Sequence, residues 1–206
     1  MTEAFLIAFT TLFVMIDPIG VAPLFAALTQ GAKLRARAVI AARGVLIAGA
    51  LLLLFGLAGD AALRGIGVSV SAFRIAGGLM LFLLAVDMLF EKRSERRKER
   101  ADAESDADDP SVFPLATPMI AGPGSLTAMI LLTAERESDL GETFAVYAAL
   151  FAVLLTTFLF LLATDLIERI LGATGIKVLT RLFGMLLGAL AVQFVMDGIS
   201  AYVSAL

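Results

Sequence analysis

The sequence contains no cysteine and no histidine. Without cysteine the chain can form no disulfide and has no thiol nucleophile, and without either residue it lacks the usual ligands of haem and of zinc sites. Proton transfer inside the protein would therefore fall to aspartate or glutamate. The serines have no partner base, and no paired-carboxylate metal motif lies in the apolar stretches. We expect no metal ion, no other cofactor and no enzyme.

Charged residues are also few, at 17% of the 206 positions, whereas 60% are hydrophobic. The mean hydropathy is +0.95. Soluble domains are about 45–50% apolar, and a surface as apolar as this one needs lipid as its solvent. The composition predicts an all-α membrane protein with lipid around it and no nucleic-acid partner. Glu3 stands where a signal peptide would carry a basic residue, so we expect the first apolar stretch to be a span.

A spanning helix needs about 20 mostly apolar residues, and the chain has six such stretches. They are Ala4–Leu28, Ala38–Ala58, Ser71–Phe90, Val112–Ala134, Thr143–Thr164 and Val178–Val203. Residues 91–110 are a run of charges; the first half could extend the third helix, and the second half is acidic and predicts a disordered linker. This cytoplasmic linker separates residues 1–90 from residues 111–206, and each part holds three spans.

The distribution of lysine and arginine predicts the orientation. Loops and helix ends on one side carry thirteen basic residues, namely Lys33, Arg35, Arg37, Arg43, Lys92, Arg93, Arg96, Arg97, Lys98, Arg100, Arg169, Lys177 and Arg181. The other side carries Arg64, Arg74 and Arg136, with an acidic loop of Glu135, Glu137, Asp139 and Glu142. The basic side is expected to be cytoplasmic, which predicts a multi-pass protein of the bacterial inner membrane with both termini periplasmic.

The six prolines fall in two clusters that correspond to each other. The segment Asp17–Pro23 aligns with Thr117–Pro123, with the same spacing between the two prolines. Three further pairs follow in order at a second offset: Gly65 with Gly172, Arg74 with Arg181, and Gly77 with Gly184. The matches predict a duplication. Because each half has three spans, the second half starts on the opposite side, and the halves become two inverted three-helix repeats.

The proline clusters predict broken first and fourth helices. A proline inside a helix removes a backbone hydrogen bond at a cost of about 3 kcal/mol, and lipid offers no replacement. Half-helix N-termini can hold a carboxylate, and unwound carbonyls can hold an ammonium group. The alternative is that the prolines only kink the bundle. The matched pair favours a substrate site made of Asp17, Pro18, Gly20, Pro23, Thr117, Pro118, Gly122, Pro123, Gly124 and Ser125.

Asp17 is the most informative single residue. A carboxylate at the membrane centre is costly unless it is paired, solvated or protonated. It could bind the ammonium group of a substrate or carry protons as the coupling ion. Alternatively it caps the half-helix that begins at Pro18, with Thr117 as the equivalent cap. The roles are compatible. Ser125 could hydrogen-bond a polar solute, or return a hydrogen bond to its own helix.

Arg74 and Arg181 lie just inside opposite mouths of the predicted bundle. Either arginine could simply extend to the interface. Their equivalent places in the repeat favour a role as gates or ion-pair partners. The glycines at positions 77, 78, 184 and 188 have the spacing of close helix packing.

The motifs at Asp17–Pro23 and Pro114–Gly124 resemble those of the MarC family of bacterial integral membrane proteins, also called the neutral amino acid transporter family. Length, six spans and a charged central loop agree as well. The family is similar in organisation to the LysE-type exporters, and this likeness implies small neutral amino acids such as glycine, alanine, serine or threonine as substrates.

We therefore expect a secondary transporter of small neutral solutes that works by alternating access at a midplane site. The alternatives are a channel, or a membrane scaffold or regulator that transports nothing. A homo-oligomer is compatible with the sequence. Substrate, direction and coupling ion are not specified by it.

Overall fold

The computed structural model describes residues 1–103, 109–134 and 139–204. The acidic loop residues Glu135 and Glu137, with Arg136 between them, lie outside the described residues. So does the acidic part of the linker at 104–108.

Every regular element in the described part of the chain is a helix. In chain order these are α1 (Thr2–Ile16), α2 (Pro18–Leu28), α3 (Leu34–Gly65), α4 (Val70–Leu89), α5 (Lys92–Ala103), the π-helix η1 (Ser111–Ile120), α6 (Pro123–Ala134), α7 (Leu140–Leu162) and α8 (Thr164–Val203). The all-α prediction is confirmed.

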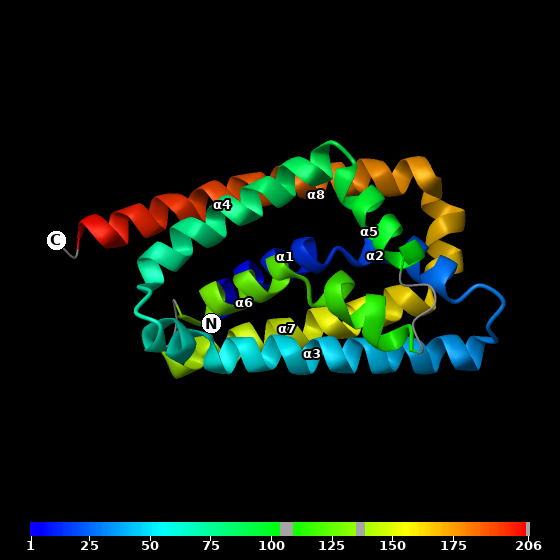
Figure 1. Cartoon of the computed structure of the whole chain (residues 1–206), viewed down its shortest axis with the longest axis horizontal. Coiled ribbons are helices and arrows are strands. Elements are labelled where there is room, and N and C mark those ends of the chain that lie inside the picture. The colour runs from blue at the N-terminus through cyan, green and yellow to red at the C-terminus, as the bar shows by residue number, and fades with distance from the viewer. Residues whose placement is uncertain (104–108, 135–138, 205–206) are drawn as a thin grey trace.

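The helices form three layers (Figure 1). Helices α4 and α8 lie side by side on one edge, α3 and α7 lie on the other, and α1, α2 and α6 run between them. Within each pair, α4 with α8, α3 with α7 and α1 with α6, the two helices run in opposite directions. The broken first span is therefore the centre of the bundle. Its most apolar stretch is 61% buried, compared with 28% for α4 and for α8.

The number of spans lies between five and six. Five segments are long and apolar enough to cross a membrane: α1 with α2, α3, α4, α7 and α8. The pair η1 and α6 is bent by 56° and makes a sixth span only if its two helices are counted together. The peripheral helices expose large apolar side chains, as lipid-facing helices must. Examples are Leu46, Leu57, Leu83, Phe151 and Met185.

Two glycines let α4 and α8 approach closely. A Cβ atom on Gly78 would lie 2.8 Å from the carbonyl oxygen of Ala191, and one on Gly184 would lie 2.9 Å from the Cβ atom of Met88. Both positions therefore require a residue without a side chain, which confirms the predicted close packing. Gly172, with φ 61°, forms a left-handed kink inside α8.

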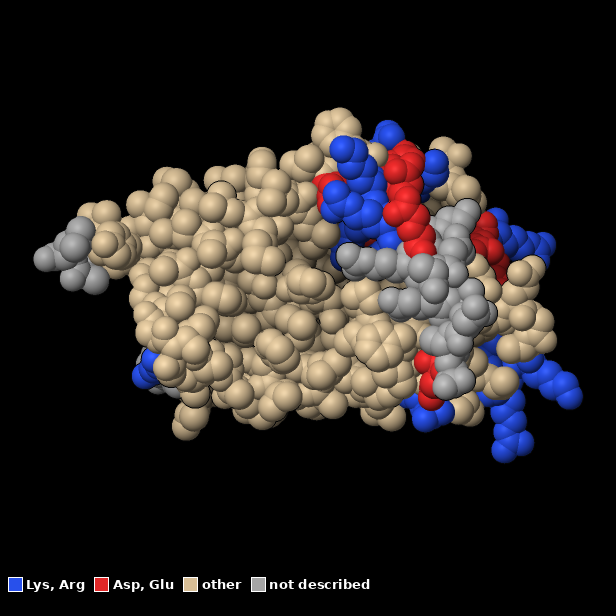
Figure 2. All heavy atoms as spheres, in the orientation of Figure 1, with Lys and Arg blue, Asp and Glu red and all other residues tan. Residues whose placement is uncertain are grey.

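Charged side chains gather at one end of the molecule, over α5 and the start of α3 (Figure 2). Both ends of the chain lie at the opposite end (Figure 1). At the charged end, Arg37 of α3 donates two hydrogen bonds to Asp165 of α8, with Nη1 3.1 Å from Oδ2 and Nη2 3.2 Å from Oδ1. This contact joins the two outer layers.

Helix α5 does not extend α4, so the expectation that the linker prolongs the third helix is wrong. Glu91 adopts φ 63° directly after α4 and turns the chain. As a result α5 packs back against the bundle. The carboxylate of Glu91 is held by two cations of α8, Lys177 Nζ at 2.8 Å and Arg181 Nη2 at 2.6 Å.

The Glu91 contact predicts a pH-dependent stability. The hydrogen bond from Lys177, with the charge of Arg181, lowers the pKa of Glu91 below its ordinary value of 4.5. A lowered pKa stabilises the fold above about pH 4.5, and this stabilisation is lost as the pH falls through the folded-state pKa. We expect Glu91→Gln to lower the melting temperature at pH 7 and to lower it less at pH 3, as measured by thermal unfolding. The control, Glu168→Gln, removes an exposed carboxylate of α8. Equal effects of Glu91→Gln at both pH values would contradict the prediction.

Candidate functional site

The first break consists of a single residue, Asp17, between α1 and α2. Pro18 has no N–H, so α1 cannot continue through it with a full set of hydrogen bonds. Asp17 adopts φ 54° and ψ 64°, and its own N–H donates to the carbonyl of Phe13 at 2.9 Å. Its Oδ1 accepts from the N–H of Gly20 at 3.1 Å. The capping role of Asp17 is confirmed, and Pro18 takes the first helical position, where proline is tolerated.

The remainder of the first motif is helical. The expectation that the chain is unwound between Pro18 and Pro23 is therefore wrong, because α2 continues through Pro23 to Leu28. Proline at the first position costs little, and the single hydrogen bond removed by Pro23 does not stop a helix that is packed on both sides. The break is confined to the first residue of the motif, Asp17, which precedes the first proline.

The second break is more extended. Within η1, Phe113 and Thr117 have extended backbone angles, and each precedes a cis proline. Two non-helical residues, at 121 and 122, separate η1 from α6. The Ser125 hydroxyl donates to the carbonyl of Ile120 at 2.7 Å and lies 3.0 Å from that of Gly122. Ser125 thus returns its hydrogen bond to its own broken span. Asp17 and Thr117 both have non-helical backbone, as their alignment predicts. The expectation that Thr117 is an equivalent cap is wrong, because its hydroxyl donates to the carbonyl of Val112 at 3.4 Å.

Two buried arginines of α5, which the sequence predicted only as part of the cytoplasmic linker, lie at the breaks, and one of them, Arg97, connects the two. Arg97 donates to Asp17 Oδ2 at 3.3 Å, to the carbonyl of Ile16 at 3.1 Å and to the carbonyl of Met119 at 3.2 Å. Ile16 closes α1 and Met119 lies near the end of η1. Terminal carbonyls of a helix have no partner within it, and the guanidinium supplies donors for both half-helices at once.

Arg93 lies one helical turn before Arg97 and enters the same region. Its Nη2 donates to the carbonyl of Met15 at 2.5 Å, and its Nη1 contacts Met88 Sδ at 2.9 Å. Only 8% of Arg93 and 9% of Arg97 is exposed. Burial, reinforced by the Arg97 guanidinium, lowers the pKa of Arg93 to about 9, which leaves it charged at neutral pH. The i, i+4 spacing of the two arginines directly after a span is the signal that could have indicated them.

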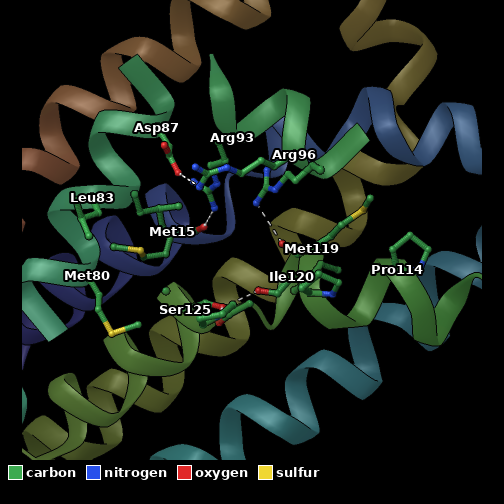
Figure 3. A pocket seen from close by; sticks show the side chains of 16 residues that line it. Met15, Met80, Leu83, Asp87, Arg93, Arg96, Pro114, Met119, Ile120 and Ser125 are labelled. Carbon is green, nitrogen blue, oxygen red and sulfur yellow. Dashed lines mark hydrogen bonds and ion pairs between the residues drawn. The ribbon is translucent and has the colours of Figure 1, made fainter. Parts of the chain in front are cut away.

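A cavity of about 290 Å³ opens beside the second break (Figure 3). Apolar side chains of α4 form one wall, and α5 contributes Arg93, Arg96 and Arg97. Arg96 is ion-paired with Asp87, which also lines the cavity. The remaining lining residues include Met15, Met80, Leu83, Leu84, Pro114, Met119 and Ile120.

The predicted substrate-binding residues divide into two groups. The cavity is lined by Pro118, Gly122, Pro123, Gly124 and Ser125. The others are not among its lining residues; they are Asp17, Pro18, Gly20, Pro23 and Thr117. Arg97 links the groups, because it contacts Asp17 and lines the cavity.

The two predicted gating arginines lie outside the cavity. Arg181 is exposed and ion-paired with Glu91. Arg74 is half-buried near the start of α4. Arg74 lies near the start of α4, whereas Arg181 pairs with Glu91 just beyond its end, so the two arginines lie toward opposite ends of α4.

Comparison with known proteins gives a consistent result. The family model described as MarC family integral membrane protein matches residues 2–203. A membrane protein of Methanocaldococcus jannaschii is 38% identical over 96% of both chains. The inner membrane protein YhgN of Escherichia coli K12 is 32% identical over 91% of this chain and 92% of its own length. No solved structure matches.

Proposed function

The chain belongs to the MarC family of integral membrane proteins, and from this premise we propose that it is a secondary transporter of small neutral solutes, with neutral amino acids as its substrates. The similarity to YhgN, an inner membrane protein, supports the same location for this chain. The basic end, which holds α5 and the start of α3, would then face the cytoplasm, with both termini on the other side.

One observation carries the proposal: two broken spans meet inside the bundle, next to a cavity. Arg97 bonds to backbone carbonyls of both breaks, and the second break forms part of the cavity wall. Non-helical backbone at membrane depth is tolerated where protein or a wet cavity covers it, and in transporters such interruptions form the substrate site. A scaffold would gain nothing from two costly interruptions at matched positions.

The dimensions and chemistry of the cavity support a small amphipathic solute. Small-molecule sites commonly occupy about 300–1,000 Å³, and this cavity, at about 290 Å³, lies at the lower limit. Its wall combines apolar side chains from α4 with guanidinium groups from α5 and open backbone at Gly122. A short amino acid has matching parts: a small side chain, a carboxylate and an ammonium group.

The mutual arrangement of the helices supports alternating access. Three antiparallel pairs, one from each set of corresponding spans, are what two inverted repeats would produce. If the two repeats adopt different conformations and exchange them, the cavity opens first to one side of the membrane and then to the other. Asp17 is the candidate proton carrier, because it is the carboxylate buried at the first break.

Transport measurements in proteoliposomes test the proposal. We expect saturable uptake of radiolabelled alanine or serine, and faster uptake when unlabelled substrate is loaded inside, because a carrier exchanges its conformations more rapidly when both sides are occupied. Liposomes without protein are the control. Flux that neither saturates nor responds to internal substrate would indicate a channel. The absence of flux for every small neutral amino acid, in both directions and under imposed pH gradients, would overturn transport.

A further inference from the structure

The cavity carries an excess of positive charge. Three guanidinium groups line it, from Arg93, Arg96 and Arg97, and two carboxylates lie beside them. Asp87 is ion-paired with Arg96, and Asp17 is ion-paired with Arg97. Among the residues that the structure describes, no carboxylate is ion-paired with Arg93. Within the described part of the chain, the three guanidinium groups therefore outnumber the two carboxylates by one, and Asp17 and Asp87 act on Arg93 only at longer range than an ion pair.

The hydrogen-bond partners of Arg93 do not neutralise its positive charge. Its two hydrogen-bond partners, the carbonyl of Met15 and the sulfur of Met88, are both neutral. A guanidinium has five N–H donors in a planar fork, so most of its donors remain available. Burying a cation without a matching anion is strongly unfavourable. A natural way to relieve that cost is an anionic group of a bound molecule, held in the cavity that Arg93 lines (Figure 3).

The N-terminus of α6 reinforces the preference for an anion. Pro123, Gly124 and Ser125, the first residues of this helix, line the same cavity. Helix N-termini carry partial positive charge and free N–H groups. At Gly124 the absence of a side chain lets Leu84 of α4 pack against this helix end, because a Cβ atom there would lie 2.7 Å from Leu84 Cδ2. Apolar side chains of α4, from Met80, Leu83 and Leu84, complete the wall.

We propose that Arg93 of the linker helix binds the carboxylate of the solute in this cavity, so that the substrates are small molecules that carry a carboxylate next to a short apolar group. The inference rests on the proposed transport function for the fate of the solute, and it assigns the specificity-determining cation of the site. A guanidinium fork matches a carboxylate with two parallel hydrogen bonds, which a lysine cannot reproduce.

Binding to the full-length protein in lipid nanodiscs, measured by isothermal titration calorimetry, tests the inference with three probes. Alanine carries both charged groups, propionate carries only the carboxylate, and alaninamide lacks the carboxylate. We expect the wild type to bind alanine at least about tenfold more tightly than alaninamide, as charge-assisted hydrogen bonds imply. Binding of propionate as well as alanine would assign the site to any small carboxylate. Binding of alanine alone would assign it to a zwitterion.

Variants at Arg93 complete the test. Arg93→Gln is expected to remove the preference for alanine over alaninamide, whereas Arg93→Lys retains the charge and part of the preference. Arg43→Gln is the matched control, because Arg43 pairs with Asp109 at 3.0 Å and does not line the cavity. Should Arg93→Gln not fold, the Arg93→Lys protein supplies the comparison, with an expected loss of affinity for alanine of a few fold or more.

Three results would overturn the inference: no binding of alanine or propionate by the wild type, equal binding of alanine and alaninamide, or variants at Arg93 that bind alanine like the wild type. These results are distinct from a failure of the proposed function. Carboxylate binding that depends on Arg93, without any flux in proteoliposomes, would overturn the transport function and support the binding site. Alanine flux that is unchanged in Arg93→Gln would support transport and overturn the role of Arg93 in binding the carboxylate.

Discussion

Replacing Asp17 with asparagine is expected to destabilise the protein by about 3–5 kcal/mol, the usual cost of breaking a buried ion pair. Asp17 is 1% exposed, and its partner Arg97 is 9% exposed. The substitution leaves a buried guanidinium without its carboxylate, while the amide oxygen can still accept from Gly20 and cap α2. Chemical unfolding of the purified protein, followed by circular dichroism, measures the loss.

Further variants separate the two roles of Asp17. Asp17→Ala removes the cap as well, which should cost about 1 kcal/mol more. In the double variant Asp17→Asn with Arg97→Gln, the buried charge is gone, so the total loss should be smaller than the sum of the single losses. Additive losses would show that the ion pair contributes nothing. An Asp17→Asn protein that is as stable as the wild type would also show that the ion pair contributes nothing to stability.

Transport by the same variant tests whether Asp17 carries protons. If Asp17 is the coupling carboxylate, Asp17→Asn moves substrate but loses its response to an imposed pH gradient. If Asp17 only caps α2 and pairs with Arg97, the pH response persists, and any loss of flux follows the loss of folded protein. Proteoliposome flux, normalised to folded protein, distinguishes these outcomes.

Gly122→Ala is expected to disrupt the second break. A Cβ atom on Gly122 would lie 2.6 Å from the carbonyl oxygen of Pro118, closer than a carbon and an oxygen approach each other in proteins. The backbone must shift, because the obstructing atom belongs to the main chain. Overpacking of this kind costs about 1–3 kcal/mol, and the shift moves the cavity wall itself. We therefore expect both a lower stability and a loss of most substrate binding, as measured by unfolding and calorimetry.

The matched control for this change is Gly65→Ala. A Cβ atom there has no neighbour within 4 Å, and the position is the last residue of α3. It should leave binding unchanged and stability equal or slightly higher, because alanine has the better helix propensity. A Gly122→Ala protein that binds and unfolds like the control would show that the second break is not part of the site.

The positions of the breaks were largely predictable from the sequence. Proline lacks an N–H, so the residue before Pro18 and the segment around Pro118 and Pro123 could be located without a structure. Their detailed form was not predictable. The first break is one capped residue and the second extends over several, because α2 tolerates Pro23 where the second span breaks before Pro123. This difference depends on what each segment packs against.

The role of α5 was not predictable in the same way. A charged run after a span is typical of a cytoplasmic linker, and, apart from an extension of the third helix, the sequence alone predicts nothing more for residues 91–110. The turn at Glu91 directs the helix back toward the bundle. Only then do Arg93 and Arg97 reach the carbonyls at the ends of α1 and η1.

The sequence by itself determined the membrane class, the resemblance to the MarC family and the places where two spans are interrupted. These properties depend on the lengths of apolar runs and on the missing N–H of proline, which act locally. The tertiary structure alone decided that Asp17 is ion-paired and that a cavity lies beside the second break. Arg97 and Asp17 are 80 positions apart, and a contact over that separation depends on how the layers pack, since no local property of either residue specifies the other.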